Sequence, residues 1–176
     1  MRNILVVVDM QKDFVDGALG TKEAVEIVPK VVREIKKKYD DVYVTMDTHA
    51  ENYLETQEGK YLPVVHCVKD TDGWKLDKKV EKALGKLDHY RVVEKPTFGS
   101  EELVRILKEE DRKEEIGSIT LIGLCTDICV VSNALLLKAA FYEKDIAVKK
   151  DCCAGVTVHS HDAALETMRM CQIRVI

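Results

Sequence analysis

Residues 121–140, LIGLCTDICVVSNALLLKAA, decide the fold of this chain, because they join an apolar strand to an apolar helix through a short turn. Residues 119–123 are predicted to form a buried strand, and residues 124–125 form the turn. Thr126 and Asp127 then supply an N-cap and a first-turn acid for the helix. A buried strand that feeds directly into a helix is typical of a parallel α/β sheet.

Cys129 is predicted to lie in the first turn of that helix. A thiol there is close to the positive end of the helix dipole and to unpaired backbone N–H groups, and both favour the thiolate. The same N–H groups would stabilise an oxyanion formed when the sulfur attacks a carbonyl. The alternative is a small buried residue that packs the helix onto the sheet, because free cysteine is among the most buried residue types.

The bulk composition predicts a single domain that spans residues 1–176. Hydrophobic residues make up 46% of the chain and charged residues 33%, which argues against disorder. The net charge of -4 argues against nucleic acid or an anionic membrane as a partner. The sequence shows no signal peptide, no membrane-spanning segment and no C-x-x-C pair among its six cysteines, so we expect a cytoplasmic protein with reduced thiols.

Strand and helix patterns alternate along the whole chain. Strands are predicted at residues 3–8, 42–46, 91–94, 119–123, 145–148 and 172–176. Helices are predicted at residues 24–39, 77–84, 101–108, 126–140 and 159–170, with residues 109–117 as a charged loop and 151–157 as a turn. Pro29 suits a first helical turn, so the regular part of the first helix is expected to begin near Val28. Because crossovers are right-handed, the pattern predicts a three-layer αβα sandwich with a six-stranded, mainly parallel sheet in the order 3-2-1-4-5-6.

Two charged residues stand where predicted strands end. Asp9 follows the strand at 3–8, and Lys95 follows the strand at 91–94. Open α/β sheets place their sites at this edge, and in the predicted order both residues can reach Cys129. The alternatives are a loop-capping role for Asp9 and a surface position for Lys95, which is the usual place of a lysine.

A second group of residues has the chemistry of metal ligands. Asp47 and His49 follow the strand at 42–46, and residues two apart in an extended chain point the same way. His66 comes later in the chain, with Glu58 between them. Two histidines and a carboxylate describe a site for zinc, iron or manganese. The alternative is a pair of hydrogen-bonded loop histidines, and the D-x-H spacing favours the metal.

Three motifs resemble the isochorismatase-like cysteine hydrolase family. They are VVVDMQKDF at residues 6–14, EKPTFGS at residues 94–100 and GLCTDICVVSNAL at residues 123–135. The resemblance implies that Cys129 is the nucleophile and that Asp9 takes its proton and later delivers one to ammonia. It implies that Lys95 keeps Asp9 ionised and favours the thiolate. It also implies an oxyanion hole from the backbone N–H groups of Cys125 and Cys129, next to a cis peptide at residues 124–125.

Within this family, nicotinamidases hold a metal through a D-x-H pair and a later histidine, as Asp47, His49 and His66 would. Glu58 falls where some of them place a further carboxylate ligand. The resemblance therefore implies a cysteine amidohydrolase, first of all a nicotinamidase of NAD salvage, which converts nicotinamide and water to nicotinate and ammonia through a thioester. The metal, zinc first with iron and manganese as alternatives, would bind the ring nitrogen. The resemblance further implies three pocket walls: Phe14, Leu19 and Phe98.

One departure from the nicotinamidase pattern keeps other functions open. Nicotinamidases commonly carry an aromatic residue just before the metal histidine, and residues 63–65 here are Pro-Val-Val. Tyr61 or Leu62 are candidates to replace it. The alternative is a related hydrolase of another small amide or of isochorismate, and a third hypothesis is a non-catalytic thiol-containing binding protein. A small-molecule amide is the expected partner, and a homo-oligomer is compatible with this fold and size.

Overall fold

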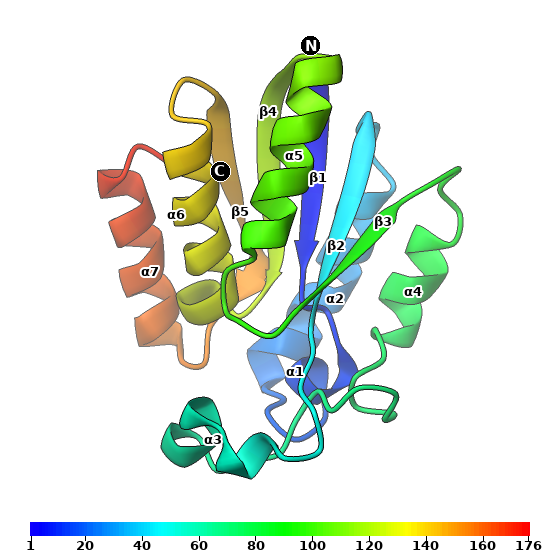
Figure 1. The fold of residues 1–176 in the computed structure, drawn as a ribbon, viewed down its shortest axis with the longest axis vertical. Helices are drawn as coiled ribbons and strands as arrows, with labels where there is room; N and C mark the ends of the chain where they lie inside the picture. Colours follow the sequence, from blue (N-terminus) through cyan, green and yellow to red (C-terminus); the bar gives the residue numbers. More distant parts are fainter.

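The computed structural model describes residues 1–176 and is built around one six-stranded parallel sheet (Figure 1). The strands are β1 (Arg2–Val8), β2 (Asp41–Asp47), β3 (Arg91–Lys95), β4 (Ile116–Leu124), β5 (Asp145–Ala154) and β6 (Arg174–Val175). Their spatial order is β3-β2-β1-β4-β5-β6, and every neighbouring pair is parallel. The predicted fold class and strand order are confirmed.

Helices cover both faces of the sheet. The longer ones are α2 (Lys22–Ile35), α4 (Lys78–Leu84), α5 (Glu101–Lys113), α6 (Val131–Ala140) and α7 (Val158–Met170). The short ones are α1 (Lys12–Val15), the 3₁₀ turn η1 (Tyr53–Glu55), α3 (Gln57–Tyr61) and the π turn η2 (Thr126–Val130). Helices α5, α6 and α7 pack on one face, and α1, α2 and α4 on the other (Figure 1). None of these helices combines the length and the apolar composition that a membrane crossing requires.

The central strand β1 shows why the sequence produces three layers. Its residues Ile4 to Val8 are all fully buried. Ile4, Val6 and Val8 point into the core beneath α5, α6 and α7, whereas Leu5 and Val7 point into the core beneath α2 and α4. Successive strand residues alternate between faces, so a continuously apolar strand requires cover on both sides.

The predicted bounds of the first helix were wrong at both ends. Helix α2 begins at Lys22, where the hydroxyl of Thr21 accepts a hydrogen bond from the Ala24 backbone, and Pro29 lies inside the helix. Pro29 removes the donor that would pair with the carbonyl of Val25. Both residues are exposed, so water can take the place of that donor and the helix continues.

Two segments that were predicted to be irregular belong to regular elements. Helix α5 continues to Lys113 through the predicted loop, with ion pairs from Arg105 to Glu109 and from Lys113 to Glu110 along its surface. Strand β5 continues through residues 151–154 after a register shift, so only the last part of the predicted turn is one. The cysteines at 152 and 153 are free, and they point into opposite cores.

Candidate active site

Near the end of β4, position 123 accepts only glycine. Gly123 has a φ of +120°, and a Cβ there would lie 2.0 Å from the carbonyl oxygen of Val8 on the neighbouring strand. A side chain is therefore excluded by both conformation and space. The next peptide bond, between Leu124 and Cys125, is cis, as the resemblance implied.

Cys129 lies in η2, the turn that follows, and not in a capped α-helix as predicted. The residue at the N-cap position is Cys125, and its side chain makes no capping bond. The predicted capping residues connect this turn to α7 and to the segment just before it. Thr126 shares a 2.8 Å hydrogen bond with His161 Nδ1, and the carboxylate of Asp127 accepts the backbone N–H of Val156 at 3.1 Å. These two contacts fix the orientation of the turn that carries the thiol.

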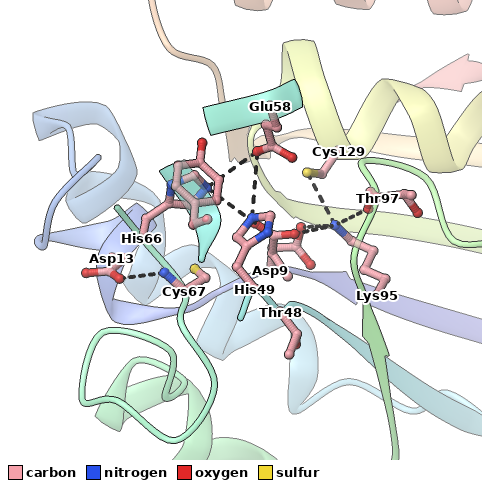
Figure 2. Close-up of polar contacts among 12 residues, drawn as sticks. Asp9, Asp13, Thr48, His49, Glu58, His66, Cys67, Lys95, Thr97 and Cys129 are labelled. Atoms are coloured by element: carbon pink, nitrogen blue, oxygen red, sulfur yellow. Dashed lines mark hydrogen bonds and ion pairs between the residues drawn. The ribbon is translucent and has the colours of Figure 1, made fainter. Parts of the chain in front are cut away.

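The structure brings together Asp9, Lys95 and Cys129, which come from the ends of three different strands and their following turns (Figure 2). The ammonium of Lys95 lies 2.7 Å from Asp9 Oδ2 and 3.4 Å from Cys129 Sγ. It also donates a 2.9 Å hydrogen bond to the carbonyl of Thr97. All three side chains are almost inaccessible, with exposed fractions of 0%, 1% and 4%.

Burial and charge set the protonation of this trio. Burial favours the neutral amine of Lys95, but the charges of Asp9, Cys129 and Asp47 outweigh it and raise the pKa of Lys95. Burial raises the pKa of Asp9 against the opposing effect of Lys95. Burial and the nearby charge of Asp9 raise the pKa of Cys129, which is the opposite of the predicted preference for thiolate. The Lys95 ammonium is therefore the positive charge of the trio, and burial disfavours a second negative charge beside it.

Two polar residues that the sequence reasoning missed hold the acidic side chains in place. Thr45 on β2 donates a 2.6 Å hydrogen bond to Asp9 Oδ1. Gln11 pairs with both backbone groups of Asp47, because its amide donates to the carbonyl and accepts the N–H, each at 2.8 Å. Their positions in the sequence could have identified both residues. Gln11 follows Asp9 by two residues, and Thr45 precedes Asp47 by two on a strand that pairs in register with β1.

The four predicted metal ligands form one cluster. Figure 2 shows three of them, His49, Glu58 and His66, beside this trio. One donor atom from each of Asp47, His49, Glu58 and His66 lies within 4.8 Å of the other three. His49 Nε2 is 3.0 Å from Asp47 Oδ2 and 3.7 Å from Glu58 Oε1. His66 Nε2 is 3.5 Å from Asp47 Oδ2 and 3.7 Å from Glu58 Oε1. Four nitrogen and oxygen donors that converge at these separations could hold one divalent cation.

The surroundings of the cluster fit a metal. The Nδ1 of His66 lies 2.7 Å from the carbonyl of Val64, which requires a proton on Nδ1 and leaves the Nε2 lone pair facing the cluster. The ring of Tyr53 packs against both histidines, with ring centroids 4.7 Å from His49 and 4.9 Å from His66. Burial opposes ionisation of Asp47, but in the absence of a metal the contacts with both imidazoles and the charge of Lys95 lower its pKa. The cluster thus supplies an anionic carboxylate and oriented imidazoles.

Both groups face one cavity of about 650 Å³. Cys125 and Cys129 line it together with Asp47, Glu58 and His66 of the cluster. All three predicted wall residues line this cavity, namely Phe14, Leu19 and Phe98. Tyr61 and Leu62 also line it, whereas Tyr53, which contacts both histidine rings, was not singled out from the sequence.

Comparison with known proteins identifies the family. The family model described as the isochorismatase domain matches residues 3–176. The isochorismatase family protein PncA of Bacillus subtilis (strain 168) is 30% identical over 94% of this chain and 93% of its own length. The nicotinamidase of Schizosaccharomyces pombe is 27% identical, over 98% of this chain and 91% of its own.

A solved structure agrees with these matches. The pyrazinamidase of Pyrococcus horikoshii in complex with zinc superposes with a TM-score of 0.81 at 26% identity, covering 100% of this chain and 99% of that protein. The match covers the whole sheet, its helices and the segments that carry the cavity. This chain therefore belongs to the isochorismatase domain family, and it is an enzyme of the hydrolase class.

Proposed function

We propose that the protein is a metal-containing cysteine amidase that hydrolyses nicotinamide to nicotinate and ammonia. One observation carries this proposal: the Lys95 ammonium contacts both Asp9 and Cys129, and Cys129 lines the same cavity as Asp47, Glu58 and His66 of the cluster. The names of two similar proteins support the substrate, because one is a nicotinamidase and the other a zinc-containing pyrazinamidase. Zinc is the first candidate metal, with iron and manganese as alternatives.

The first half of the reaction moves the thiol proton. The proton of Cys129 passes to the Asp9 carboxylate as the sulfur attacks the carboxamide carbon, so the negative charge moves from Asp9 to the oxyanion of the substrate. Backbone N–H groups of Cys125 and Cys129 donate to the oxyanion of the tetrahedral intermediate. Asp9 then delivers its proton to the departing nitrogen, the C–N bond breaks, and ammonia leaves a thioester on the sulfur.

The second half restores the enzyme. A water molecule attacks the thioester carbon while Asp9 accepts one of its protons, and the C–S bond breaks to release the carboxylic acid, which loses its remaining proton to solvent to give the carboxylate product. The leaving sulfur recovers the proton from Asp9. Asp47, His49, Glu58 and His66 would hold the metal, which when bound supplies a Lewis acid for the ring nitrogen and so orients the carboxamide toward the sulfur.

Ammonia release from nicotinamide tests the proposal. The metal-loaded wild type should release ammonia, Cys129→Ala should not, and mass spectrometry of acid-quenched wild type should show a nicotinoyl adduct on the peptide that contains Cys129. Equal rates for the two proteins would overturn the proposal.

A second candidate is a hydrolase of another small amide or of isochorismate. It is favoured by one observation, the absence of an aromatic residue at positions 63–65 before His66. Rates on nicotinamide, pyrazinamide, benzamide and isochorismate separate the candidates, because only the first two amides carry a ring nitrogen meta to the carboxamide. A rate on benzamide equal to that on nicotinamide would favour the second candidate.

A further inference from the structure

We propose that the outer part of the cavity, formed by Tyr61, Leu62, Phe98 and Val156, binds an apolar substituent on C5 of the nicotinamide ring. We call these four residues the outer chamber. The inference rests on the proposed function and names a narrower substrate class, in which 5-aryl nicotinamides are preferred to nicotinamide itself.

The size of the cavity gives the first reason. Its volume is about 650 Å³. A cavity of roughly 150 Å³ is enough to hold benzene, and nicotinamide is a ring of that size with one carboxamide group. Nicotinamide would therefore fill well under half of the space, and a second ring can be accommodated without moving the backbone.

The polarity of the lining gives the second reason. The charged lining residues Asp47, Glu58 and His66 all belong to the metal cluster, and Cys129 lies beside it. The outer chamber carries no charge. Two distinct regions therefore line the same cavity, one with the reactive groups and one that is apolar.

Exposure shows which of these regions faces solvent. Cys129 is 4% exposed and His66 2%, so the reactive end lies deep in the protein. Tyr61 is 84% exposed, Val156 52%, Phe98 45% and Leu62 36%, so the outer chamber forms the mouth. Apolar side chains that stay exposed around a cavity mark a ligand-binding surface, because burying them against a ligand removes them from water.

The chemistry of the inner end selects the ring position. The ring nitrogen is position 1 and the carboxamide is on C3, and in the proposed function both point to the inner end. C5 is meta to both, so it is the ring atom directed away from the cluster and from the sulfur, toward the mouth. A substituent on the ring nitrogen, such as a phosphoribosyl group, would instead occupy the space of the metal cluster, and the outer chamber has no charged side chain to bind the phosphate.

Competition between two amides tests this inference. With metal-loaded wild type, 5-phenylnicotinamide should show a kcat/KM at least about tenfold above that of nicotinamide, since burial of an aromatic ring commonly strengthens binding by that factor or more. As a readout independent of turnover, calorimetry with metal-loaded Cys129→Ala should show a Kd for 5-phenylnicotinamide at least about tenfold below that for nicotinamide. The inference is overturned if 5-phenylnicotinamide shows neither a higher kcat/KM nor a lower Kd than nicotinamide.

Variants of the chamber locate the effect. Val156→Trp and Leu62→Trp fill the mouth, and each should reduce the preference for the larger amide, measured as the ratio of the two kcat/KM values, by at least about tenfold. Val25→Trp is the matched control, because Val25 is 48% exposed on α2 and does not line the cavity. The same loss of preference in the control would contradict a role for the chamber.

The two proposals fail differently. If nicotinamide is hydrolysed and 5-phenylnicotinamide is neither bound nor hydrolysed, the outer chamber is disproved and the proposed function stands. If neither amide releases ammonia but the phenyl compound still binds Cys129→Ala more tightly and this binding is lost in Leu62→Trp, the amidase proposal fails and the chamber stands.

Discussion

The ammonium of Lys95 lies 2.7 Å from the carboxylate of Asp9, in a place where the two side chains are 1% and 0% exposed. A buried ion pair is costly to break from one side, because the remaining charge loses its partner but stays out of water. We therefore expect Lys95→Met to lower the free energy of unfolding by about 3–5 kcal/mol, measured by urea denaturation. Lys69→Met, which removes an exposed ion pair with Glu94, is the control and should change it by less than about 1 kcal/mol.

Removing the charge of Asp9 should separate catalysis from binding. Asp9→Asn keeps the shape of the side chain but cannot accept the thiol proton, so we expect kcat for ammonia release to fall by about 10²–10⁴. The Kd for nicotinamide should change far less than kcat. Asp16→Asn, at an exposed position a few residues later, should retain the wild-type rate. A kcat of Asp9→Asn within about threefold of wild type would contradict the role of proton acceptor.

Glu58 comes from α3, whereas the other three clustered side chains come from strand ends and loops next to the sheet. If it is a ligand, Glu58→Gln should weaken zinc binding at least about tenfold, because a neutral amide oxygen is a poorer donor than a carboxylate. Competition with a chromophoric chelator measures this affinity. Glu55→Gln, in the neighbouring turn and outside the cluster, is the matched control, and equal zinc affinities in the two variants would exclude Glu58 from the ligand set.

Glu34, which does not line the cavity, should make the stability of the protein depend on pH. This carboxylate is 4% exposed, and Tyr39 donates to it at 2.7 Å while the ammonium groups of Lys37 and Lys149 each lie 2.8 Å away. Burial alone would raise the pKa of Glu34, but these partners together lower it. Its contribution is therefore complete above the unfolded-state pKa of about 4.3 and is lost as the pH falls through the lower folded value.

We expect Glu34→Gln to be less stable than wild type by about 1–3 kcal/mol at pH 7, with a smaller difference near pH 3. Denaturant unfolding at the two pH values measures this, and Glu26→Gln on the exposed face of the same helix should differ by less than about 0.5 kcal/mol at both. A difference for Glu34→Gln that grows on acidification would contradict the assignment.

Gly123 should be intolerant of any side chain. Gly123→Ala places a Cβ 2.0 Å from the carbonyl of Val8 at a φ of +120°, so β1 and β4 would have to separate. We expect a loss of at least about 3 kcal/mol in stability or failure to fold, assessed by thermal unfolding and circular dichroism. Gly85→Ala is the control, because its φ is -64° and its nearest contact would be an ordinary 3.4 Å, so its stability should stay the same or rise slightly.

The sequence was sufficient to predict the site residues that lie at the ends of strands. Asp9, Asp47 and Lys95 each follow or end an apolar strand, and a parallel sheet brings such positions to one edge whatever their separation in the chain. Residue type made Glu58 a candidate beside the histidines, and the family resemblance added that it falls at a ligand position, because α3 is a five-residue helix held by the Thr56 cap and has no periodic pattern of its own.

Other features depend on burial, which residue spacing does not reveal. The helix dipole suggested a lowered pKa for Cys129, but a 4% exposed thiol beside the Asp9 carboxylate has a raised one. Helix α5 was predicted too short for a different reason. The run of charged residues at 109–113 suggested a loop, whereas in the structure these residues continue the helix and form ion pairs along its surface.

The order of the strands also has a consequence for biosynthesis. Asp9 and Lys95 follow or end β1 and β3, which lie on one side of β4 in the sheet. Cys129 follows β4, which is synthesised after both of them. If Cys129 is the nucleophile, as proposed, a growing polypeptide carries Asp9 and Lys95 long before the residue that attacks the substrate, and we expect no hydrolysis until the later half has been added. A chain cut between α5 and β4 should likewise be inert as separate pieces, so turnover reports that both halves have been joined into one sheet.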